Sequence, residues 1–368
     1  MSWFLVLPAL IIWVAILLLP WRPWSVKERF EEFDENDSPD LSNITALVPA
    51  RNEADVIKES LTALSKQGIG LNIIVIDDQS TDNTASVVRN FPSVHLIEGV
   101  PLPTGWIGKL WALEQGYRLV KTEFILLLDA DIKLSPGVLS ALMRKMKREN
   151  ISLISLMAKL RMETYWEKLL IPGFIYFFKL LYPFGLSNQR DYRNIAAAAG
   201  GCMLVTKTAI DEIEGFQALR HALIDDCALA RRIKLQGNKI WIGLTKGAES
   251  LRSYTTLQSI WDMVARTAFT QLNYSFLLLL GLTVIFALAF WLPIFALFAS
   301  DIKVQILASI ALLAMAISYL PTLKFYGVAI YWIFSMPVMG TYYLAMTWSS
   351  AIRYWQGQRS EWKGRVYQ

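Results

Sequence analysis

Apolar residues are distributed unevenly along this chain, and this unevenness limits what it can fold into. They form an uncharged run at residues 2–20 and dominate residues 271–350, whereas the region between has an ordinary share of charges. Over the 368 residues, 54% are hydrophobic and 18% are charged, which excludes a disordered chain. The average is also too apolar for an ordinary soluble enzyme. The pattern predicts a soluble-type domain held on a membrane.

Four apolar segments are candidates for crossing a membrane. Residues 2–20 have about the length of one crossing, which takes roughly 20 residues, and residues 1–24 therefore predict an N-terminal membrane anchor. Three more candidates lie within 271–350, at 275–299, 303–320 and 326–349. A fifth run, 168–186, contains Lys179 and two prolines. It favours an element at the membrane interface, with a buried core helix as the alternative.

Basic residues beside these segments predict the orientation of the chain. The net charge is +5, from 36 Lys and Arg against 31 Asp and Glu. Because the basic residues gather next to apolar segments, they favour membrane anchoring over binding to nucleic acid. Arg22, Lys27 and Arg29 predict that the next domain is cytoplasmic, in a multi-pass membrane protein. The basic tail, 351–368, conflicts with this orientation, because four crossings would place it outside.

The region between the apolar segments has the pattern of an α/β domain. A charged linker at 25–40 precedes it, and the domain itself is expected at 41–270. Strand-like runs alternate with helical patterns, which predicts a Rossmann-like, largely parallel sheet covered on both faces. The expected strands are 44–48, 71–76, 94–97 and 123–128, and the expected helices are 54–66, 82–90 and 108–121. Ligands of such sheets bind beyond the carboxyl ends of the strands.

Acidic side chains follow three of the expected strands. Glu53, with Arg51, comes after the strand 44–48. Asp129 and Asp131 come after an apolar run and offer hard oxygens to Mg²⁺ or Mn²⁺, although a helix cap and turn would use the same residues. Asp77 and Asp78 could accept hydrogen bonds from a base or a ribose, whereas Ser80 to Asp82 suit a cap of the next helix. Carboxylates gathered at one edge of the sheet are the main functional signal.

Two further positions carry charged groups near the start of a helix. Lys109 follows a glycine-containing loop that lacks the Walker A spacing; it could meet a phosphate or simply be solvated. Asp225 and Asp226 begin a helical pattern, where a carboxylate is either a cap or a general base. The small residues of 196–203 suit either a substrate floor or a tightly packed strand.

The chain has only two cysteines and two histidines. Cys202 and Cys227 do not form a C-x-x-C pair, which excludes a disulfide scaffold and a cysteine-rich zinc site. His95 and His221 are too few for a metal centre built from several histidines. Both cysteines are expected to be packing residues, and His221 could have an auxiliary role near Asp225.

Several motifs occur together in a specific order: VPARNE, VIDDQSTDNTA, GKLWALEQG, LLLDADI, GGCMLVTK and DDCALARRIKLQG. In this order they resemble the family 2 glycosyltransferases of the GT-A fold over residues 44–270. Details resemble the membrane-bound branch that contains ceramide glucosyltransferases. The segments PTGWIGKLWALEQG, LLIPGFIYFFKLLYPF and VARTAFTQL look closest to the hopene-associated glycosyltransferases of bacterial hopanoid biosynthesis. This resemblance implies a location in a bacterial inner (plasma) membrane.

The resemblance implies roles for individual residues. The nucleoside of a nucleotide-sugar donor, a UDP-sugar by resemblance, would lie on Arg51, Glu53, Asp77 and Asp78, with Lys109 approaching the donor. Asp129 and Asp131 would hold the metal, Mg²⁺ or Mn²⁺, and the diphosphate. Asp226 would be the catalytic base, although the base could also be Asp225. Arg266 matches the arginine of the family's Gln/Arg-x-x-Arg-Trp motif, but Met263 and Thr267 depart from it, which leaves the role of that segment open.

Together these features predict an inverting, metal-dependent transfer of a sugar from a nucleotide sugar to a membrane-lipid hydroxyl. A hopanoid is the expected acceptor, with a carotenoid, a sterol or a glycerolipid as alternatives. Two other classes share parts of the pattern: a non-catalytic membrane scaffold or lipid-binding protein that keeps the GT-A fold, and a metal-dependent nucleotidyltransferase. Carboxylates on three strand ends argue against the scaffold, and no clear sugar-phosphate site supports the nucleotidyltransferase.

Overall fold

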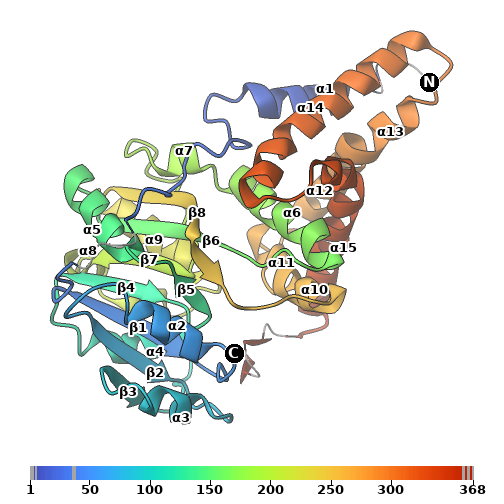
Figure 1. Ribbon diagram of the computed structural model, residues 1–368. Helices are drawn as coiled ribbons and strands as arrows, with labels where there is room; N and C mark the ends of the chain where they lie inside the picture. The colour runs from blue at the N-terminus through green and yellow to red at the C-terminus, as the bar shows by residue number, and fades with distance from the viewer. Residues whose placement is uncertain (1–3, 5, 35–38, 359–360, 363–364, 367–368) are drawn as a thin grey trace. The chain divides into compact units, whose positions relative to one another are not determined.

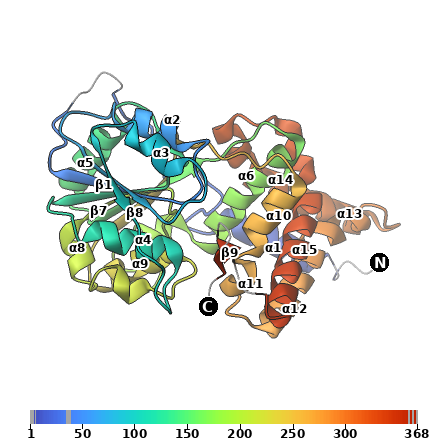
Figure 2. The ribbon, with the colours of Figure 1, turned by 90° about the horizontal axis from the view of Figure 1, so that it is seen from below.

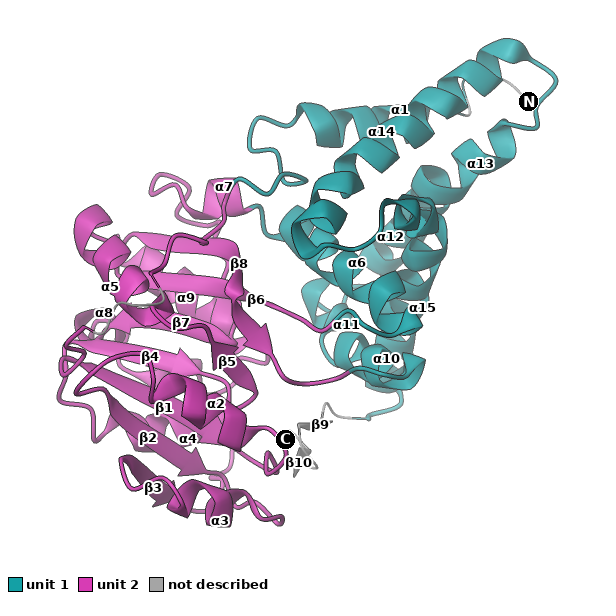
Figure 3. Cartoon of the chain, in the orientation of Figure 1, with its two compact units in different colours: residues 1–27, 162–183, 254–360 teal, residues 28–161, 184–253, 361–368 magenta. Residues whose placement is uncertain are grey.

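The computed structural model describes the chain except residues 1–3, 5, 35–38, 359–360, 363–364 and 367–368. The chain forms two compact units (Figure 3). The sheet unit contains residues 28–161, 184–253 and 361–368, and the helical unit contains residues 1–27, 162–183 and 254–360.

An eight-stranded mixed sheet forms the centre of the sheet unit, in the order β3-β2-β1-β4-β7-β6-β8-β5 (Figure 1). β1 pairs in parallel with β2 and β4, β2 pairs in parallel with β3, and β6 with β8. β7 is antiparallel to both of its neighbours, and β5 is antiparallel to β8. The strands are β1 (Ile44–Ala50), β2 (Asn72–Asp77), β3 (Val94–Glu98), β4 (Phe124–Leu128), β5 (Ile132–Leu134), β6 (Leu153–Lys159), β7 (Cys202–Thr206) and β8 (Ile240–Ser250).

Helices cover both faces of this sheet, which is why its central strands are apolar on both sides. Every residue of β1 is buried. Ala46 and Val48 pack into the core on one face, and Leu47 packs into the core on the other, as the two-residue period of a strand requires. Figure 2 shows α2, α3 and α5 on one face and α4, α8 and α9 on the other. Their bounds are α2 (Ile57–Leu64), α3 (Thr84–Arg89), α4 (Gly108–Tyr117), α5 (Val138–Glu149), α8 (Lys207–Asp211) and α9 (Asp225–Leu235).

The four expected strands and the three expected helices between them are present. The sheet is mixed rather than largely parallel, because β7 enters between β4 and β6 in the opposite direction. The described part of the expected charged linker is not wholly separate from the sheet: Phe30 is buried, and its backbone N–H donates to the Leu244 carbonyl at 2.8 Å. Residues 196–201 form a loop before β7, not a strand.

The helical unit contains three stretches of the chain. Its elements are α1 (Leu7–Leu18), α6 (Tyr165–Leu181), α10 (Leu257–Ala265), α11 (Ala268–Gln271), α12 (Phe276–Phe286), η3 (Ala287–Trp291), α13 (Leu292–Ala296), α14 (Ile302–Tyr326), η4 (Ile330–Ser335) and α15 (Met336–Trp355). α7 (Phe184–Ser187) and η2 (Phe216–Leu219) belong to the sheet unit. α6 covers most of the segment 168–186 and packs against α14 and α15. Buried residues fill one side of α6, including Lys179.

Two helical segments among the described residues are long and apolar enough to cross a membrane, Phe276–Ala296 and Ile302–Tyr326. They correspond to the expected crossings 275–299 and 303–320. The expected crossing 326–349 is divided between the 3-10 helix η4 and the 20-residue helix α15, and neither is among these two segments. α1 has 12 residues and is about 18 Å long, shorter than the roughly 30 Å hydrocarbon layer.

One buried side chain, Gln67, ties the end of α2 to the segment that runs from β5 into α5. Its amide Nε2 donates to the Ser135 carbonyl at 2.9 Å, and its Oε1 accepts from the Leu139 backbone N–H at 3.1 Å. Gln67 is fully buried.

We therefore expect Gln67→Leu to lower the free energy of unfolding by about 1–3 kcal/mol, because the Leu139 N–H and the Ser135 carbonyl would lose a buried partner. Thermal unfolding of the detergent-solubilised protein measures this. Gln189→Leu is the control, since Gln189 is exposed and bonds only within its own turn among the contacts described, and it should cost under about 0.5 kcal/mol. Equal losses in the two variants would contradict the role of Gln67.

Candidate active site

The site lies at the sheet edge where β1, β2 and β4 end. Ala50 is paired with Asp77, and Leu47 with Leu127, so the residues that follow these parallel strands reach the same edge. β7 runs the opposite way and begins there, with Cys202 opposite Leu128. The sheet register therefore brings together three strand ends and one strand start, as expected for the ligand edge of a Rossmann-like sheet.

Lys109 joins two of the acidic positions at this edge. It lies in the first turn of α4, and its Nζ is 2.7 Å from Asp129 Oδ1 and 3.7 Å from Asp225 Oδ2. Burial alone would lower the pKa of Lys109, but Asp129, Asp225 and Asp226 outweigh this and raise it. A cation in the first turn of a helix is disfavoured by the helix dipole, so these carboxylates are what hold Lys109 charged in this place.

The loop before β7 places a backbone donor against Asp226. The Gly200 N–H donates to Asp226 Oδ2 at 2.8 Å, and the Cys227 N–H donates to Oδ1 at 2.7 Å. A Cβ on residue 200 would come within 3.2 Å of Lys109 Nζ and 3.3 Å of Asp226 Oδ2, so this close approach favours glycine. The small residues at 196–201 therefore let the loop reach both charged side chains.

Two buried polar side chains hold this loop in place. Ser155 Oγ donates to the Ala199 carbonyl at 3.0 Å and accepts from the Ala199 N–H at 2.7 Å. Lys234 on α9 donates to the Ser187 carbonyl at 2.6 Å and to the Ile195 carbonyl at 2.7 Å. The loop is thus tied to β6 below it and to the same helix that carries Asp226.

Asp226 has the electrostatics of a proton acceptor. Burial and the neighbouring Asp225 raise its pKa to about 7, although Lys109 and the backbone N–H groups of Cys227 and Gly200 act in the opposite sense. A carboxyl group with a pKa near the working pH is well matched to general base catalysis. Each carboxylate oxygen has two acceptor positions, so the backbone bonds leave room for a proton.

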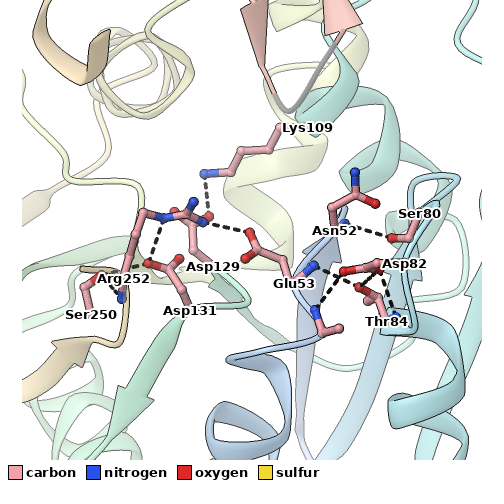
Figure 4. Close-up of polar contacts among 11 residues, drawn as sticks. Asn52, Glu53, Ser80, Asp82, Thr84, Lys109, Asp129, Asp131, Ser250 and Arg252 are labelled. Atoms are coloured by element: carbon pink, nitrogen blue, oxygen red, sulfur yellow. Dashed lines mark hydrogen bonds and ion pairs between the residues drawn. The ribbon is translucent and has the colours of Figure 1, made fainter. Parts of the chain in front are cut away.

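The loops after β1 and β2 are bound to each other (Figure 4). The Asn52 N–H donates to Ser80 Oγ at 3.0 Å, and the Glu53 N–H donates to Thr84 Oγ1 at 2.8 Å. Arg51 donates to the Asp78 carbonyl at 2.5 Å and to the Gln79 carbonyl at 2.9 Å. These bonds join the two loops into one rim.

The acidic residues of this rim differ in exposure. Asp77 accepts a hydrogen bond from Ser80 Oγ, and its side chain is mostly buried. Asp78 is fully buried. Glu53 is mostly buried and faces the Asp129–Asp131 side of the rim, where it meets Arg252 (Figure 4).

Arg252 and Ser250 belong to the site, although sequence analysis did not identify them. Arg252 donates to Glu53 Oε1 at 2.8 Å, and its Nε is 3.5 Å from Asp131 Oδ2. Ser250 Oγ donates to Asp131 Oδ2 at 2.7 Å. Ser250 is the last residue of β8 and Arg252 lies two residues later, and no motif in the sequence marks either of them.

A divalent metal fits the donor set at this edge. Five carboxylates, those of Glu53, Asp129, Asp131, Asp225 and Asp226, share the two cations Lys109 and Arg252. Among the described residues no three or more His, Cys, Asp or Glu are grouped to hold a metal. Mg²⁺ and Mn²⁺ are commonly bound through one or two carboxylates plus substrate phosphates, which Asp129 and Asp131 can supply.

Among the other residues that the sequence analysis singled out are an arginine, two cysteines and a histidine. Arg266 directly follows α10 in the helical unit. Cys202 and Cys227 are buried free thiols, and burial raises the pKa of Cys202 to about 12, so it is not a nucleophile. His221 accepts a hydrogen bond from Arg220 at 3.0 Å.

Comparison with known families identifies the part of the chain that carries this site. Residues 45–214 match the model of glycosyl transferase family 2. This segment is a family 2 glycosyltransferase domain. For this segment, the expected enzyme class and the GT-A type of α/β fold are therefore confirmed. The match includes Lys109, Asp129 and Asp131, whereas Asp226 and Arg252 follow it.

The curated relatives match this chain over a short region. The 4,4'-diaponeurosporenoate glycosyltransferase of Staphylococcus haemolyticus (strain JCSC1435) is 32% identical over 94 residues, 25% of each chain. The enzyme of the same name from Staphylococcus aureus (strain USA300) is 36% identical over 90 residues, 24% of each chain. The chain thus spans about a quarter of the length of these relatives. The expected special closeness to hopene-associated enzymes is not among these matches.

One solved structure resembles nearly the whole chain. It is the mannosyltransferase PcManGT from Pyrobaculum calidifontis in complex with GDP-Man and Mn²⁺. The TM-score is 0.56 at 18% sequence identity, and the match covers 95% of this chain and 98% of that chain. At this identity the likeness shows the fold.

The raised pKa of Asp226 predicts a pH-dependent effect on stability. A carboxyl group with a pKa near 3.8 when unfolded and about 7 when folded binds more protons in the folded state, so it destabilises the fold as pH rises between these values. Asp226→Asn should therefore raise the free energy of unfolding by at least about 1 kcal/mol at pH 8, and much less at pH 4. Unfolding curves at the two pH values measure this.

Asp211→Asn is the matched control with the opposite sign. Burial tends to raise the pKa of Asp211, but hydrogen bonds from Lys207 and Tyr117 lower it overall. The folded state therefore gains from ionised Asp211, and its loss should destabilise the protein at pH 8. If Asp226→Asn were as destabilising at pH 8 as this control, the electrostatic strain assigned to Asp226 would be disproved.

Proposed function

We propose that this protein transfers a sugar, with inversion, from a nucleotide sugar to an isoprenoid lipid held in a membrane. The observation that carries the proposal is the cluster in which Lys109 joins Asp129, a carboxylate of the Asp-x-Asp motif, to the Asp225–Asp226 pair. This arrangement brings a group that can hold the donor's diphosphate next to a group that can accept a proton. In an inverting transfer, the leaving diphosphate lies on one side of the sugar carbon that is attacked, and the base lies on the other.

The donor would lie along the rim formed by the loops after β1 and β2. Glu53 and Asp77, with Arg51 and the buried Asp78 behind them, would form the nucleoside end, and Asp129 and Asp131 would hold the metal at the diphosphate. When bound, a divalent cation would stabilise the negative charge on the leaving nucleoside diphosphate. Lys109 supplies a fixed positive charge for the same leaving group. The neighbour solved with GDP-Man and Mn²⁺ supports a donor and a metal of this kind.

Asp226 would be the base. Its two backbone N–H bonds fix its orientation, and its raised pKa lets it take a proton near neutral pH. Asp225 lies 3.7 Å from Lys109 and would steady that cation. Arg266 lies in the helical unit, and a donor or acceptor contact for it remains part of this proposal.

The acceptor is proposed to be an isoprenoid lipid. The curated relatives are named for 4,4'-diaponeurosporenoate, an isoprenoid acid, and the motif resemblance favours a hopanoid hydroxyl. The two acceptors differ in whether they need a base to remove a proton. A hydroxyl must lose a proton as it attacks, whereas a carboxylic acid is already ionised at neutral pH.

The two apolar helical segments support attachment to a membrane. Large apolar side chains are exposed along them, among them Leu277, Val284, Ile306 and Leu313. Such a continuous apolar surface suits lipid better than water. We propose that these helices cross the inner membrane, that α1 helps to anchor the chain there, and that the sheet unit is cytoplasmic, where nucleotide sugars are made.

Asp226→Asn tests the base. It preserves the shape of the side chain but cannot take the proton, so transfer to a hydroxyl acceptor should fall by at least about 10²-fold. Asparagine can satisfy only one of the two backbone N–H groups, so donor binding is measured in parallel and should be nearly unchanged. Release of nucleoside diphosphate from a panel of nucleotide sugars, with and without lipid, measures transfer.

Asp225→Asn is the matched variant, and it should lose less, because Asp225 acts through Lys109. If Asp225→Asn is the inactive one, the base is Asp225. A hopanoid alcohol and a carotenoid acid are assayed as acceptors side by side. If Asp226→Asn keeps full transfer to the acid and loses transfer to the alcohol, the acid needs no base; full transfer to both acceptors would disprove the mechanism.

Membrane orientation can be tested with single cysteines, because Cys202 and Cys227 are buried and should react slowly. Arg148→Cys, on the exposed side of α5, should resist an impermeant thiol reagent in intact cells. Ser300→Cys, between α13 and α14, should be labelled quickly if these helices cross the membrane. Fast labelling at 148 with protection at 300 would reverse the proposed orientation.

A further inference from the structure

Arg252 lies between two acidic side chains, Asp131 of the Asp-x-Asp motif and Glu53 of the rim. One of its terminal nitrogens is 2.8 Å from Glu53 Oε1, and its Nε is 3.5 Å from Asp131 Oδ2. Figure 4 shows the guanidinium between the two acidic side chains. Both carboxylates are mostly buried, so pairing with a cation matters more for them than for exposed groups.

The backbone fixes Arg252 at this place. Ser250 pairs with Ile132 across β5 and β8, and the Leu251 N–H donates to the Asp131 carbonyl at 2.7 Å. Ser250 Oγ donates to Asp131 Oδ2 at 2.7 Å and accepts from the Arg252 N–H at 3.3 Å. The end of β8 is therefore attached to Asp131 through both main chain and side chain, and Arg252 follows directly.

A cation already at Asp131 must compete with a metal for the same negative charge. Asp131 Oδ2, the oxygen nearest Arg252 Nε, also accepts from Ser250, so it is occupied when no metal is bound. The Arg252 side chain is 34% exposed, compared with 16% for Lys109, so Arg252 has more room to move. It also keeps a partner, Glu53, if it leaves Asp131.

We propose that Arg252 is the resident counter-ion of Asp131, which a divalent cation must displace in order to bind. This inference rests on the proposed function in one respect, the assignment of Asp131 as a metal ligand. Displacement turns a planar guanidinium, well suited to phosphate oxygens, toward the donor's diphosphate. Metal and donor therefore bind more tightly together than apart, because Arg252 loses Asp131 and gains phosphate in the same step.

The test measures Mn²⁺ affinity directly, by electron paramagnetic resonance of free Mn²⁺ with the full-length protein in detergent. Arg252→Gln removes the competing charge, so Mn²⁺ alone should bind at least about threefold more tightly than to the wild type, which lies within the range for a partly exposed ion pair. UDP and GDP are then added separately, and at least one of them should tighten Mn²⁺ binding to the wild type. For the nucleotide with the larger effect, the factor by which it increases Mn²⁺ affinity should be at least about threefold smaller in the variant. A merely structural Arg252 would weaken Mn²⁺ binding when removed.

Lys133→Gln is the matched control for a change in local charge. Lys133 lies two residues after Asp131 but pairs with Glu59 at 2.6 Å. Its loss should leave Mn²⁺ affinity within about twofold. If Lys133→Gln tightens Mn²⁺ binding as much as Arg252→Gln, or if Arg252→Gln has no effect, the displacement is wrong while the metal site stands. If neither nucleotide tightens Mn²⁺ binding to the wild type, the displacement is likewise wrong. If the wild type and both variants fail to bind Mn²⁺ at all, the metal assignment itself fails and the inference with it.

Discussion

The pairing of β4 with β7 is the constraint on which the site depends. Because β7 is antiparallel to β4, its first residue lies opposite the last residue of β4, and the Asp129 N–H donates to the Gly201 carbonyl at 3.0 Å. The loop before β7 is thereby held against the Asp-x-Asp motif. Gly200 then meets Asp226 and comes close to Lys109, so one strand pairing brings the proposed base and the diphosphate end of the site together.

In the protein alone, carboxylates outnumber cations at this edge. Five carboxylates surround two cations. Burial and the neighbouring Asp225 together raise the pKa of Asp226. Such strain costs stability and is retained where it serves a reaction. A metal and a donor diphosphate would complete the charge pattern, and Lys109 and Arg252 hold the carboxylates in order until then.

The helical unit solves a different problem, the placement of polar groups among apolar helices. Buried Lys179 donates to the Ser25 carbonyl at 3.1 Å and to Thr322 Oγ1 at 3.0 Å, so it joins the chain after α1 to α14. Buried Glu167 accepts from the Thr164 N–H at 3.0 Å and the Tyr254 N–H at 2.8 Å. Thr164 and Tyr254 lie near the two points where the chain passes from the sheet unit into the helical unit, so one carboxylate ties these two points together. Each group is costly without its partners, which makes these contacts specific.

The sequence by itself determined the local features of this protein. Largely apolar runs indicated β1, β2 and β4, because strands buried on both faces are mostly apolar. The positions of Asp77, Asp129 and Asp131 after such strands, and of Asp226 at a helix start, were equally readable, since they depend on neighbours in the chain. The order of the motifs was enough to indicate the glycosyltransferase family.

Only the tertiary structure decided which of these residues meet. Nothing local shows that β7 is antiparallel, that Asp78 is fully buried, or that η4 interrupts the expected third crossing. Arg252 could not be found from the sequence, because it lies 199 residues from Glu53 and reaches it only through the pairing of β8 with β5. The sequence specifies each strand through its own side chains, but contacts between distant strands depend on the register and direction of a sheet that forms as a whole.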